Sequence, residues 1–458
     1  MGPGTLKIPN TMFRDNRERV CSEISKKAGF QDTLLFFQGG NQEYRFDTDT
    51  GVTFLQESNF MWLFGVVEPN FYGAIVSETC QSLLFMPRLP KSYEVWLGAL
   101  KSPDFFKQHY GVDFVYYSDE ILGTLGQMNS SSLVVLNGTN GYGGRRFPMP
   151  HFDGMDKFNI RGDVLYDLVV DLRLIKSEIE ISILRYVTRI SGEAHNEVLK
   201  TLKPGDMEYM AEATFRYECY ARGGMRHMGY TAICPSGEMT AVLHYGHAGE
   251  PNDREIMDGD LLLFDMGGEY AGYTTDITVS FPANGKFTDQ QKFVYNTCLR
   301  ANRAIIEQTM ISGKLVNASD ALGARIIMEE FVKEGLLNGT VDEMLAVGLG
   351  RVFLPHGLSH HIGLDVHDVE DLLRTTKLLQ VGMVVTVEPG VYFGDQLIEN
   401  AYDNEEQSKF MVREVIEPYR GMGGVRIEDV VVITAEKAEL LSNNIPRTVE
   451  EIENCMKD

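Results

Sequence analysis

The amino-acid sequence predicts an α/β domain over residues 1–170, followed by an α+β domain over residues 171–458 with duplicated units of helices and antiparallel sheet. Three observations favour this organisation. A chain of 458 residues is long enough for more than one hydrophobic core. Short apolar runs separated by turns fill the first part of the chain. In the second part, a pair of helices is followed by apolar strands, and this order occurs twice.

The first domain contains short apolar runs that are typical of strands, at residues 33–37, 72–76, 82–86 and 132–136. Helical segments are expected among them, over residues 16–27 and 93–100. Few candidate catalytic groups occur in this part of the chain. We therefore expect a structural role for it, in covering one side of a site or in pairing subunits.

Each half of the second domain opens with a helix that carries a recognisable start signal. Ser177 and Glu180 form a capping box, and apolar residues then keep helical spacing until Pro204-Gly205. A second helix is expected over residues 207–221. In the other half, Thr288 and Gln291 form a capping box for a helix through residue 306, and a further helix covers about residues 320–333.

The two halves also match where their strands end. The sequence His244-Tyr-Gly-His247 precedes an apolar strand that ends at Asp265. Likewise, His356-Gly-Leu-Ser-His360 precedes an apolar strand that ends at Glu388. Each half thus offers histidines, a glycine-centred turn and a carboxylate at a strand end, which indicates a duplicated unit with a site between the halves.

Composition excludes several classes of protein. The net charge is −23 and there is no long basic run, so nucleic acid and anionic membranes are unlikely partners. Six cysteines without a Cys-x-x-Cys motif argue against a zinc knuckle or a disulfide framework and fit a reducing compartment. No apolar run approaches the ~18 residues of a membrane span, and the N-terminus lacks a signal peptide's apolar region. We therefore expect a cytoplasmic protein.

The stretch between Asp265 and Asp276 is the centre of the functional prediction. Folded as a hairpin about Tyr270-Ala271, it would make the two aspartates cross-strand neighbours with side chains on one face. Adjacent carboxylates repel and raise one another's pKa, so a divalent metal pair is the natural group between them. For a lone hairpin, an aspartate that caps a turn is the favoured explanation.

Further residues downstream favour the metal site. His360 lies near a turn, Glu388 ends a strand at a Pro-Gly turn, and Glu428 follows Arg426 on the same face of a strand. Four carboxylates and one imidazole suit a pair of Mn²⁺, Co²⁺ or Zn²⁺ ions better than a thiolate site would. The candidate metal ligands are Asp265, Asp276, His360, Glu388 and Glu428.

This series of residues resembles the pita-bread metallopeptidases, which include methionine aminopeptidase, aminopeptidase P and prolidase. Longer strings are similar to the prolidase group of Xaa-Pro dipeptidases, and the similarity covers nearly the whole chain. They are HYGHAG (244–249), FDMGGEY (264–270), FPANGKF (281–287), PHGL (355–358) and GVRIE (424–428).

The resemblance implies a pita-bread catalytic domain, a homodimer and two Mn²⁺ ions per subunit, with Zn²⁺ or Co²⁺ as alternatives. The implied reaction is hydrolysis of dipeptides at the bond preceding a C-terminal proline or hydroxyproline, by a water that bridges the two metal ions. Glu388 would take and return the proton.

Substrate-binding residues are also implied by the resemblance. His244 and His367 would contact the substrate and stabilise the tetrahedral intermediate. Arg374 would pair with the C-terminal carboxylate of a dipeptide, and Tyr230 would line the pocket. Arg426 would orient Glu428 from behind the ligands.

Two alternatives remain open at this point. The segment 368–374 is shorter than the corresponding loop of the family, and an open pocket there would favour an aminopeptidase P-like enzyme that cuts longer Xaa-Pro peptides. A pita-bread protein without activity that serves as a binding module is the other alternative. The presence of all five candidate ligands argues against it.

Overall fold

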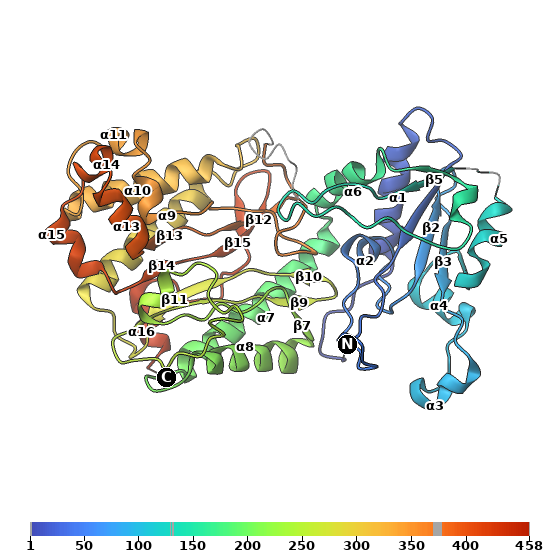
Figure 1. The fold of residues 1–458 in the computed structure, drawn as a ribbon, viewed down its shortest axis with the longest axis horizontal. Helices are drawn as coiled ribbons and strands as arrows, with labels where there is room; N and C mark the ends of the chain where they lie inside the picture. The colour runs from blue at the N-terminus through green and yellow to red at the C-terminus, as the bar shows by residue number, and fades with distance from the viewer. Residues whose placement is uncertain (1, 129, 131, 370–377, 458) are drawn as a thin grey trace. The chain divides into compact units, whose positions relative to one another are not determined.

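The computed structural model describes residues 2–128, 130, 132–369 and 378–457. The chain divides into two compact units (Figure 1). The N-terminal unit contains residues 7–174, and the C-terminal unit contains residues 175–368 and most of the chain that follows. Among the described helices, none combines the length and the hydropathy that crossing a membrane requires.

The N-terminal unit is built on a six-stranded mixed sheet with the order β4-β3-β2-β1-β5-β6. The pairs β1/β2 and β2/β3 are antiparallel and the remaining pairs are parallel. The strands are β1 (Leu34–Gln38), β2 (Tyr72–Val76), β3 (Ser82–Met86), β4 (Phe114–Tyr117), β5 (Ser132–Val135) and β6 (Asn159–Arg161). The helices are α1 (Thr11–Ser25), α2 (Ser58–Phe64), α3 (Glu94–Leu97), α4 (Pro103–Tyr110), α5 (Ile121–Gly126) and α6 (Leu165–Leu174).

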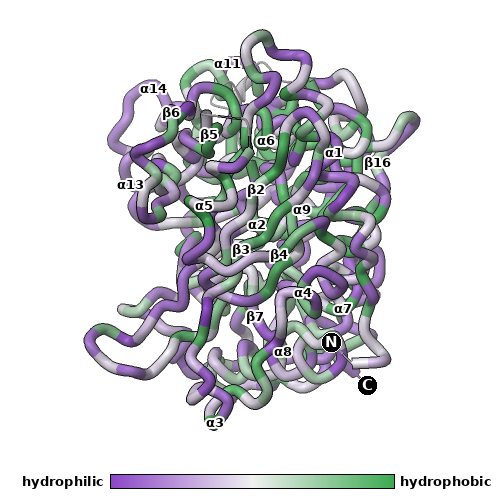
Figure 2. The backbone as a smooth tube through the Cα atoms, turned by 90° about the vertical axis from the view of Figure 1, so that its right-hand side faces the viewer, coloured by the Kyte–Doolittle hydropathy of each residue, from purple (hydrophilic) through white to green (hydrophobic). Residues whose placement is uncertain are grey.

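The hydrophobic core of this unit lies on the sheet. Leu34, Phe36, Leu83, Phe85 and Leu133 come from three different strands that are rich in Leu, Val and Phe, and all belong to one buried cluster. Figure 2 shows this hydrophobic character along β2 and β3. All four strands predicted in this region are confirmed to within one residue at either end.

Three predictions for this region differ from the structure. The first helix begins at Thr11, five positions before the predicted start, and the helix expected over residues 93–100 is limited to Glu94–Leu97. Gly98 ends it with a φ of 72°, which leaves the helical region. The cysteine spacing argues against a disulfide framework, yet one disulfide is present, because Cys21 and Cys80 are bonded with their Cα atoms 5.9 Å apart. Chain folding brings together two cysteines that are 59 positions apart, which spacing alone does not reveal.

The C-terminal unit contains four long helices, and the predicted starts of α7 and α9 are confirmed. Both capping boxes are present: Ser177 with Glu180, and Thr288 with Gln291. The long helices are α7 (Glu178–Thr201), α8 (Glu208–Gly223), α9 (Asp289–Gln308) and α10 (Ala318–Glu334). Shorter helices are α11 (Val341–Ala346), α12 (Gly350–Phe353), α13 (Asp395–Tyr402), α14 (Glu405–Ser408), α15 (Arg413–Ile416) and α16 (Val449–Cys455).

The strands of this unit pair antiparallel in four small sheets, with the orders β10-β9-β7, β11-β8, β12-β15-β16 and β13-β14. The first two sheets use β7 (His227–Met228), β8 (Leu261–Asp265), β9 (Gly268–Tyr270), β10 (Tyr273–Thr274) and β11 (Thr278–Pro282). The other two use β12 (Val384–Val387), β13 (Gly390–Tyr392), β14 (Gly424–Arg426), β15 (Asp429–Ile433) and β16 (Ala438–Leu440).

The hairpin that carries the two aspartates turns one residue later than predicted. Its central residues are Ala271 and Gly272, with φ values of 53° and 86°. A two-residue turn of this type needs positive φ at both positions, and glycine adopts that conformation without strain. The register therefore pairs Asp265 with Thr278, so the predicted direct pairing of Asp265 with Asp276 is wrong.

Candidate metal centre

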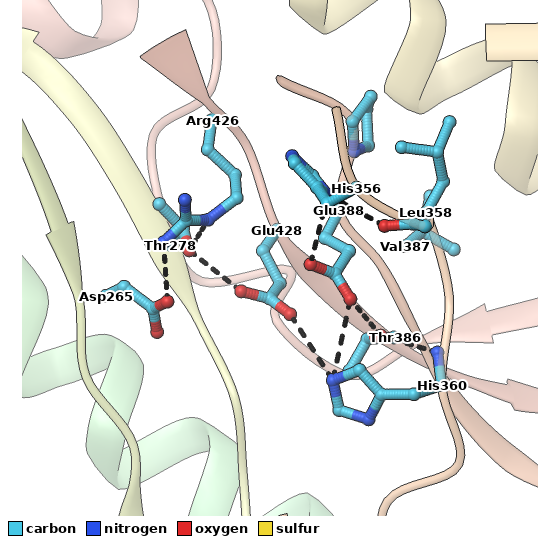
Figure 3. A network of polar contacts seen from close by, with 12 residues as sticks. Asp265, Thr278, His356, Leu358, His360, Thr386, Val387, Glu388, Arg426 and Glu428 are labelled. Carbon is cyan, nitrogen blue, oxygen red and sulfur yellow. Dashed lines mark hydrogen bonds and ion pairs between the residues drawn. The ribbon is translucent and has the colours of Figure 1, made fainter. Parts of the chain in front are cut away.

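Three of the predicted ligands converge at one point. Ligand atoms of Asp276, His360 and Glu428 all lie within 4.8 Å of one another, and all three side chains are buried. The His360 Nε2 atom lies 3.4 Å from the Asp276 carboxylate, 4.0 Å from Glu428 and 3.5 Å from Glu388. Figure 3 shows the His360 contacts with Glu388 and Glu428. The sequence pattern thus corresponds to a real cluster in the described residues.

Asp265, the fifth predicted ligand, is joined to this cluster through Tyr230. The Tyr230 hydroxyl lies 2.5 Å from a carboxylate oxygen of Asp265 and within hydrogen-bond distance of Asp276. The other Asp265 oxygen accepts a hydrogen bond of 2.6 Å from Arg426. The shifted hairpin register therefore still leaves both aspartates on one face, with a tyrosine between them.

Backbone pairing explains why His360 and Glu388 are neighbours. Residues 358–361 run beside β12, with hydrogen bonds from Thr386 N to His360 O (2.9 Å) and from Glu388 N to Leu358 O (3.1 Å). The His360 Nδ1 atom lies 3.0 Å from the His361 carbonyl oxygen, which can only accept a hydrogen bond. This contact makes Nδ1 the donor and directs Nε2 toward the carboxylates.

Hydroxyl groups support the carboxylates from behind. Thr278 donates a hydrogen bond of 2.8 Å to Glu428, and Thr386 lies 3.3 Å from Glu388. Arg426 was predicted to orient Glu428. In the structure it bonds directly to Asp265, and it reaches Glu428 through the Thr278 hydroxyl, which accepts its Nε–H at 3.0 Å (Figure 3).

Burial and mutual repulsion displace the pKa values of these acids. Burial, with the neighbouring Asp276, raises the pKa of Asp265 to about 7. Burial also raises the pKa of Glu388 and, still more, that of Glu428. Burial acts to raise the pKa of Asp276 as well, but the hydrogen bond and charge of His360, together with the hydrogen bond from Tyr230, outweigh burial and lower the pKa below its usual value.

The donor set fits a divalent metal ion. The cluster brings three buried carboxylates and the partly buried Glu388 together with one imidazole and one guanidinium group. A divalent cation would offset the remaining negative charge and so relieve the repulsion that, after burial, contributes to raising three of the four carboxylate pKa values. Oxygen donors with a single nitrogen are a typical set for such ions.

The sequence interpretation left His356 without an assigned role. Its Nε2 atom lies 2.9 Å from the Tyr392 hydroxyl, which also accepts a hydrogen bond of 3.1 Å from Arg426. Its Nδ1 atom lies 3.9 Å from Glu388. The position of His356 in the same turn as His360 was the only sequence signal for a role at the site. Its partner Tyr392 comes from a distant strand, so the contact could not be predicted.

The predicted substrate-binding residues are only partly connected to the cluster. The ring of His367 is 4.6 Å from that of His360 in an edge-on arrangement, and Tyr230 bridges the aspartates as described above. His244 is exposed and lies near enough to His356 to contribute to its lowered pKa of about 4, for which burial is the main cause. Arg374 lies outside the described residues.

Known proteins match this chain over its full length. A model of metallopeptidase family M24 matches residues 182–435, and a model of the aminopeptidase P N-terminal domain matches residues 13–135. The Xaa-Pro dipeptidases of Mus musculus and Homo sapiens are both 48% identical to it over 471 residues, which cover 100% of this chain and 95% of each relative.

Solved structures give the same result for the fold. Escherichia coli aminopeptidase P with the inhibitor Pro-Leu has a TM-score of 0.82 at 30% identity, and Pseudomonas aeruginosa aminopeptidase PepP has a TM-score of 0.83 at 30% identity. Each match covers 99% of both chains. The predicted fold class is thereby confirmed, and this chain belongs to metallopeptidase family M24.

Proposed function

We propose that this protein is a metal-dependent dipeptidase that hydrolyses Xaa-Pro dipeptides at the bond before the C-terminal proline or hydroxyproline. The observation that carries the proposal is the convergence of Asp276, His360 and Glu428, with Asp265 and Glu388 beside them, in a chain with full-length similarity to Xaa-Pro dipeptidases.

Two divalent ions per subunit, Mn²⁺ in our proposal and Zn²⁺ or Co²⁺ as alternatives, would be held by these five residues. Four carboxylates offer enough oxygen donors for two ions, whereas one imidazole alone limits the site's affinity for softer metals. When bound, such ions supply Lewis acidity toward the scissile carbonyl group and lower the pKa of water.

Glu388 is the proposed proton carrier. Its carboxylate sits at the rigid end of β12, and a hydrogen bond from Thr386 fixes one oxygen. Burial raises its pKa, which brings the group closer to the range in which a carboxylate both accepts and returns a proton near neutral pH. It accepts the proton of the attacking water and delivers it to the leaving proline nitrogen.

The remaining side chains would bind and orient the dipeptide. His367, edge-on to His360, and His244 donate hydrogen bonds to the oxygen that becomes negative during the reaction. Tyr230 holds the two aspartates in place, and Arg374 pairs with the substrate's C-terminal carboxylate. In this proposal the N-terminal unit pairs subunits in a homodimer.

A second candidate function is cleavage of longer Xaa-Pro peptides. The two solved structures compared above are aminopeptidases P, which favours this alternative. Their identity to this chain is 30%, against 48% for the Xaa-Pro dipeptidases, so the dipeptidase is the better supported of the two.

Hydrolysis of Gly-Pro and of Gly-Pro-Pro by the Mn²⁺-loaded protein, before and after chelation, separates the two functions. We expect cleavage of Gly-Pro alone, and loss of that cleavage with the chelator. Cleavage of the tripeptide would indicate the aminopeptidase activity. Failure to cleave either peptide while Mn²⁺ is bound would refute both and favour the binding module.

An Asp276→Asn variant tests the site assignment. Asparagine keeps the size of the side chain but removes the negative charge that a divalent ion requires. We expect a loss of activity larger than the roughly 10–100-fold typical of residues behind the metal ligands. The circular dichroism spectrum should remain that of a folded protein. A folded variant with full activity would refute the assignment.

A further inference from the structure

Helix α7 presents a buried polar face to the hairpin that carries the two aspartates. Thr188, Ser191 and His195 follow one another at intervals of three and four residues, so they share one side of the helix. All three are completely buried. In Figure 1, α7 lies beside β9 and β10, with which it is in contact. Buried polar groups on a helix are unfavourable unless they find partners.

The partners are backbone and side-chain groups at the interruption of the hairpin. The regular pairing of β8 with β11 stops at Asp265, and that of β9 with β10 stops at Thr274. Two backbone hydrogen bonds cross the interval, from Met266 N to Ile277 O and from Thr275 N to Gly268 O. Asp276 lies inside this interval, so its position depends on the contacts that fix the backbone there.

Helix α7 provides hydrogen-bond partners for groups at the interruption of the strand pairing. His195 Nε2 lies 2.9 Å from the Met266 carbonyl oxygen, immediately after Asp265 in the chain. Ser191 accepts a hydrogen bond of 3.2 Å from Gly268 N. The Thr188 hydroxyl is 2.9 Å from that of Thr275, immediately before Asp276.

His195 would be a poor choice for packing alone. Because a carbonyl oxygen only accepts, Nε2 carries the proton, and Nδ1 of the neutral ring is buried with no hydrogen-bond partner in the described part of the chain. Burial also lowers the pKa of His195 to about 4, so the ring is neutral near pH 7. A leucine would fill the space beside Phe215 without an unsatisfied nitrogen. The bond to Met266 is therefore the feature that requires a histidine.

We infer that Thr188, Ser191 and His195 are positioning residues that hold the interrupted hairpin so that Asp265 and Asp276 face a common metal site. His195 contacts the residue after one aspartate, Thr188 contacts the residue before the other, and Ser191 contacts Gly268 between them. In the described part of the chain, none of these hydrogen bonds goes to a carboxylate of the two aspartates. This inference rests on the proposed function in that it takes the two aspartates as metal ligands. The helix that opens the C-terminal unit thereby becomes part of the metal centre.

The test is equilibrium binding of Mn²⁺ to metal-free protein, measured by calorimetry for wild type and four variants. His195→Leu removes the donor, and we expect Mn²⁺ affinity to fall about tenfold, as for other residues behind metal ligands. His195→Gln places an amide N–H within reach of the Met266 carbonyl and should restore most of the affinity. Thr188→Val should lower affinity in the same direction by a smaller factor.

The matched control is Tyr186→Phe, which also removes a hydrogen bond from α7 to a backbone carbonyl, that of Gly223 at the end of α8. It should lower thermal stability and leave Mn²⁺ affinity unchanged. Wild-type affinity in His195→Leu would overturn the inference, as would an equal loss in Tyr186→Phe. If His195→Leu does not fold, the Mn²⁺ affinity of Thr188→Val becomes the test, and an unchanged affinity in that variant overturns the inference.

These outcomes are separable from failure of the proposed function. Wild-type protein that binds Mn²⁺ but does not cleave Gly-Pro refutes the dipeptidase, and the binding series still tests the positioning role. Wild-type protein that binds no Mn²⁺ refutes the metal site and, with it, the inference.

Discussion

At the scale of single residues, Asp265 and His360 both hold a proton more tightly in the folded protein than in the unfolded chain. Burial and the nearby Asp276 raise the pKa of Asp265 to about 7. Burial lowers the pKa of His360, but the hydrogen bond with Asp276 and the charge of Glu388 outweigh this and raise the pKa to about 9. Without metal, protons therefore balance part of the cluster's charge.

We predict that the metal-free protein loses stability as the pH rises from 7 to 9. In this range the unfolded histidine, with a pKa near 6.5, is already neutral, whereas folded His360 still binds a proton. Because the folded state binds more protons, the free energy of unfolding falls with rising pH, by on the order of 2 kcal/mol. Urea unfolding at pH 7 and pH 9 in the presence of a chelator measures it.

Two controls identify the source of this pH dependence. His360→Gln removes the group with the pKa of about 9 and should reduce the pH dependence between pH 7 and 9, leaving the smaller contribution of Asp265. Mn²⁺-loaded wild type should show the opposite trend, because protons compete with the metal for its ligands. A metal-free protein whose stability rises over this range would contradict the prediction.

At the scale of elements, the turn at Ala271-Gly272 places an alanine in an unfavourable backbone conformation. Ala271 has a φ of 53°, a region that alanine adopts unfavourably and asparagine tolerates. We predict that Ala271→Asn raises the free energy of unfolding by about 0.5–1 kcal/mol, because Asn-Gly is the preferred pair for this turn. Urea midpoints of the two proteins provide the measurement, with Gly-Pro hydrolysis as a check that the site is unchanged. A destabilised variant would disprove the turn argument.

Elements with strong local signals were predictable from the sequence. The capping boxes at Ser177 and Thr288 mark helix starts by their own hydrogen bonds, so no distant residue is needed to recognise them. The apolar strand before Asp265 was equally clear. The hairpin register was not, because Tyr270-Ala271 and Ala271-Gly272 differ by one position, and backbone conformation decides between them.

Contacts between distant segments were the part that sequence patterns could not supply. Arg426 and Glu428 share a strand face, and Arg426 was expected to orient Glu428, yet Arg426 bonds to Asp265 from another sheet. The role of His195 was also hidden, since one histidine on an amphipathic helix is ordinary. Its partner is the backbone carbonyl of Met266, and such a group cannot be recognised from the residue types in the sequence.

At the scale of the whole molecule, each compact unit has its own source of stability: a disulfide in one and a candidate metal site in the other. The Cys21–Cys80 disulfide lies within the N-terminal unit and closes a chain segment with a sequence separation of 59. In the chain-entropy model a loop of this size contributes about 4 kcal/mol. The candidate metal ligands all lie within the C-terminal unit, where metal binding would add about 2.7 kcal/mol at a hundred times Kd.

We therefore predict two calorimetric transitions that respond to different treatments. Removing Mn²⁺ with a chelator should lower the transition of the C-terminal unit and leave the other in place. Cys21→Ser should lower only the transition of the N-terminal unit. This variant is preferable to a reducing agent, because small thiols bind metal ions and would affect both units. A single transition that moves with both treatments would show that the units unfold together, and the disulfide would then stabilise the metal centre as well.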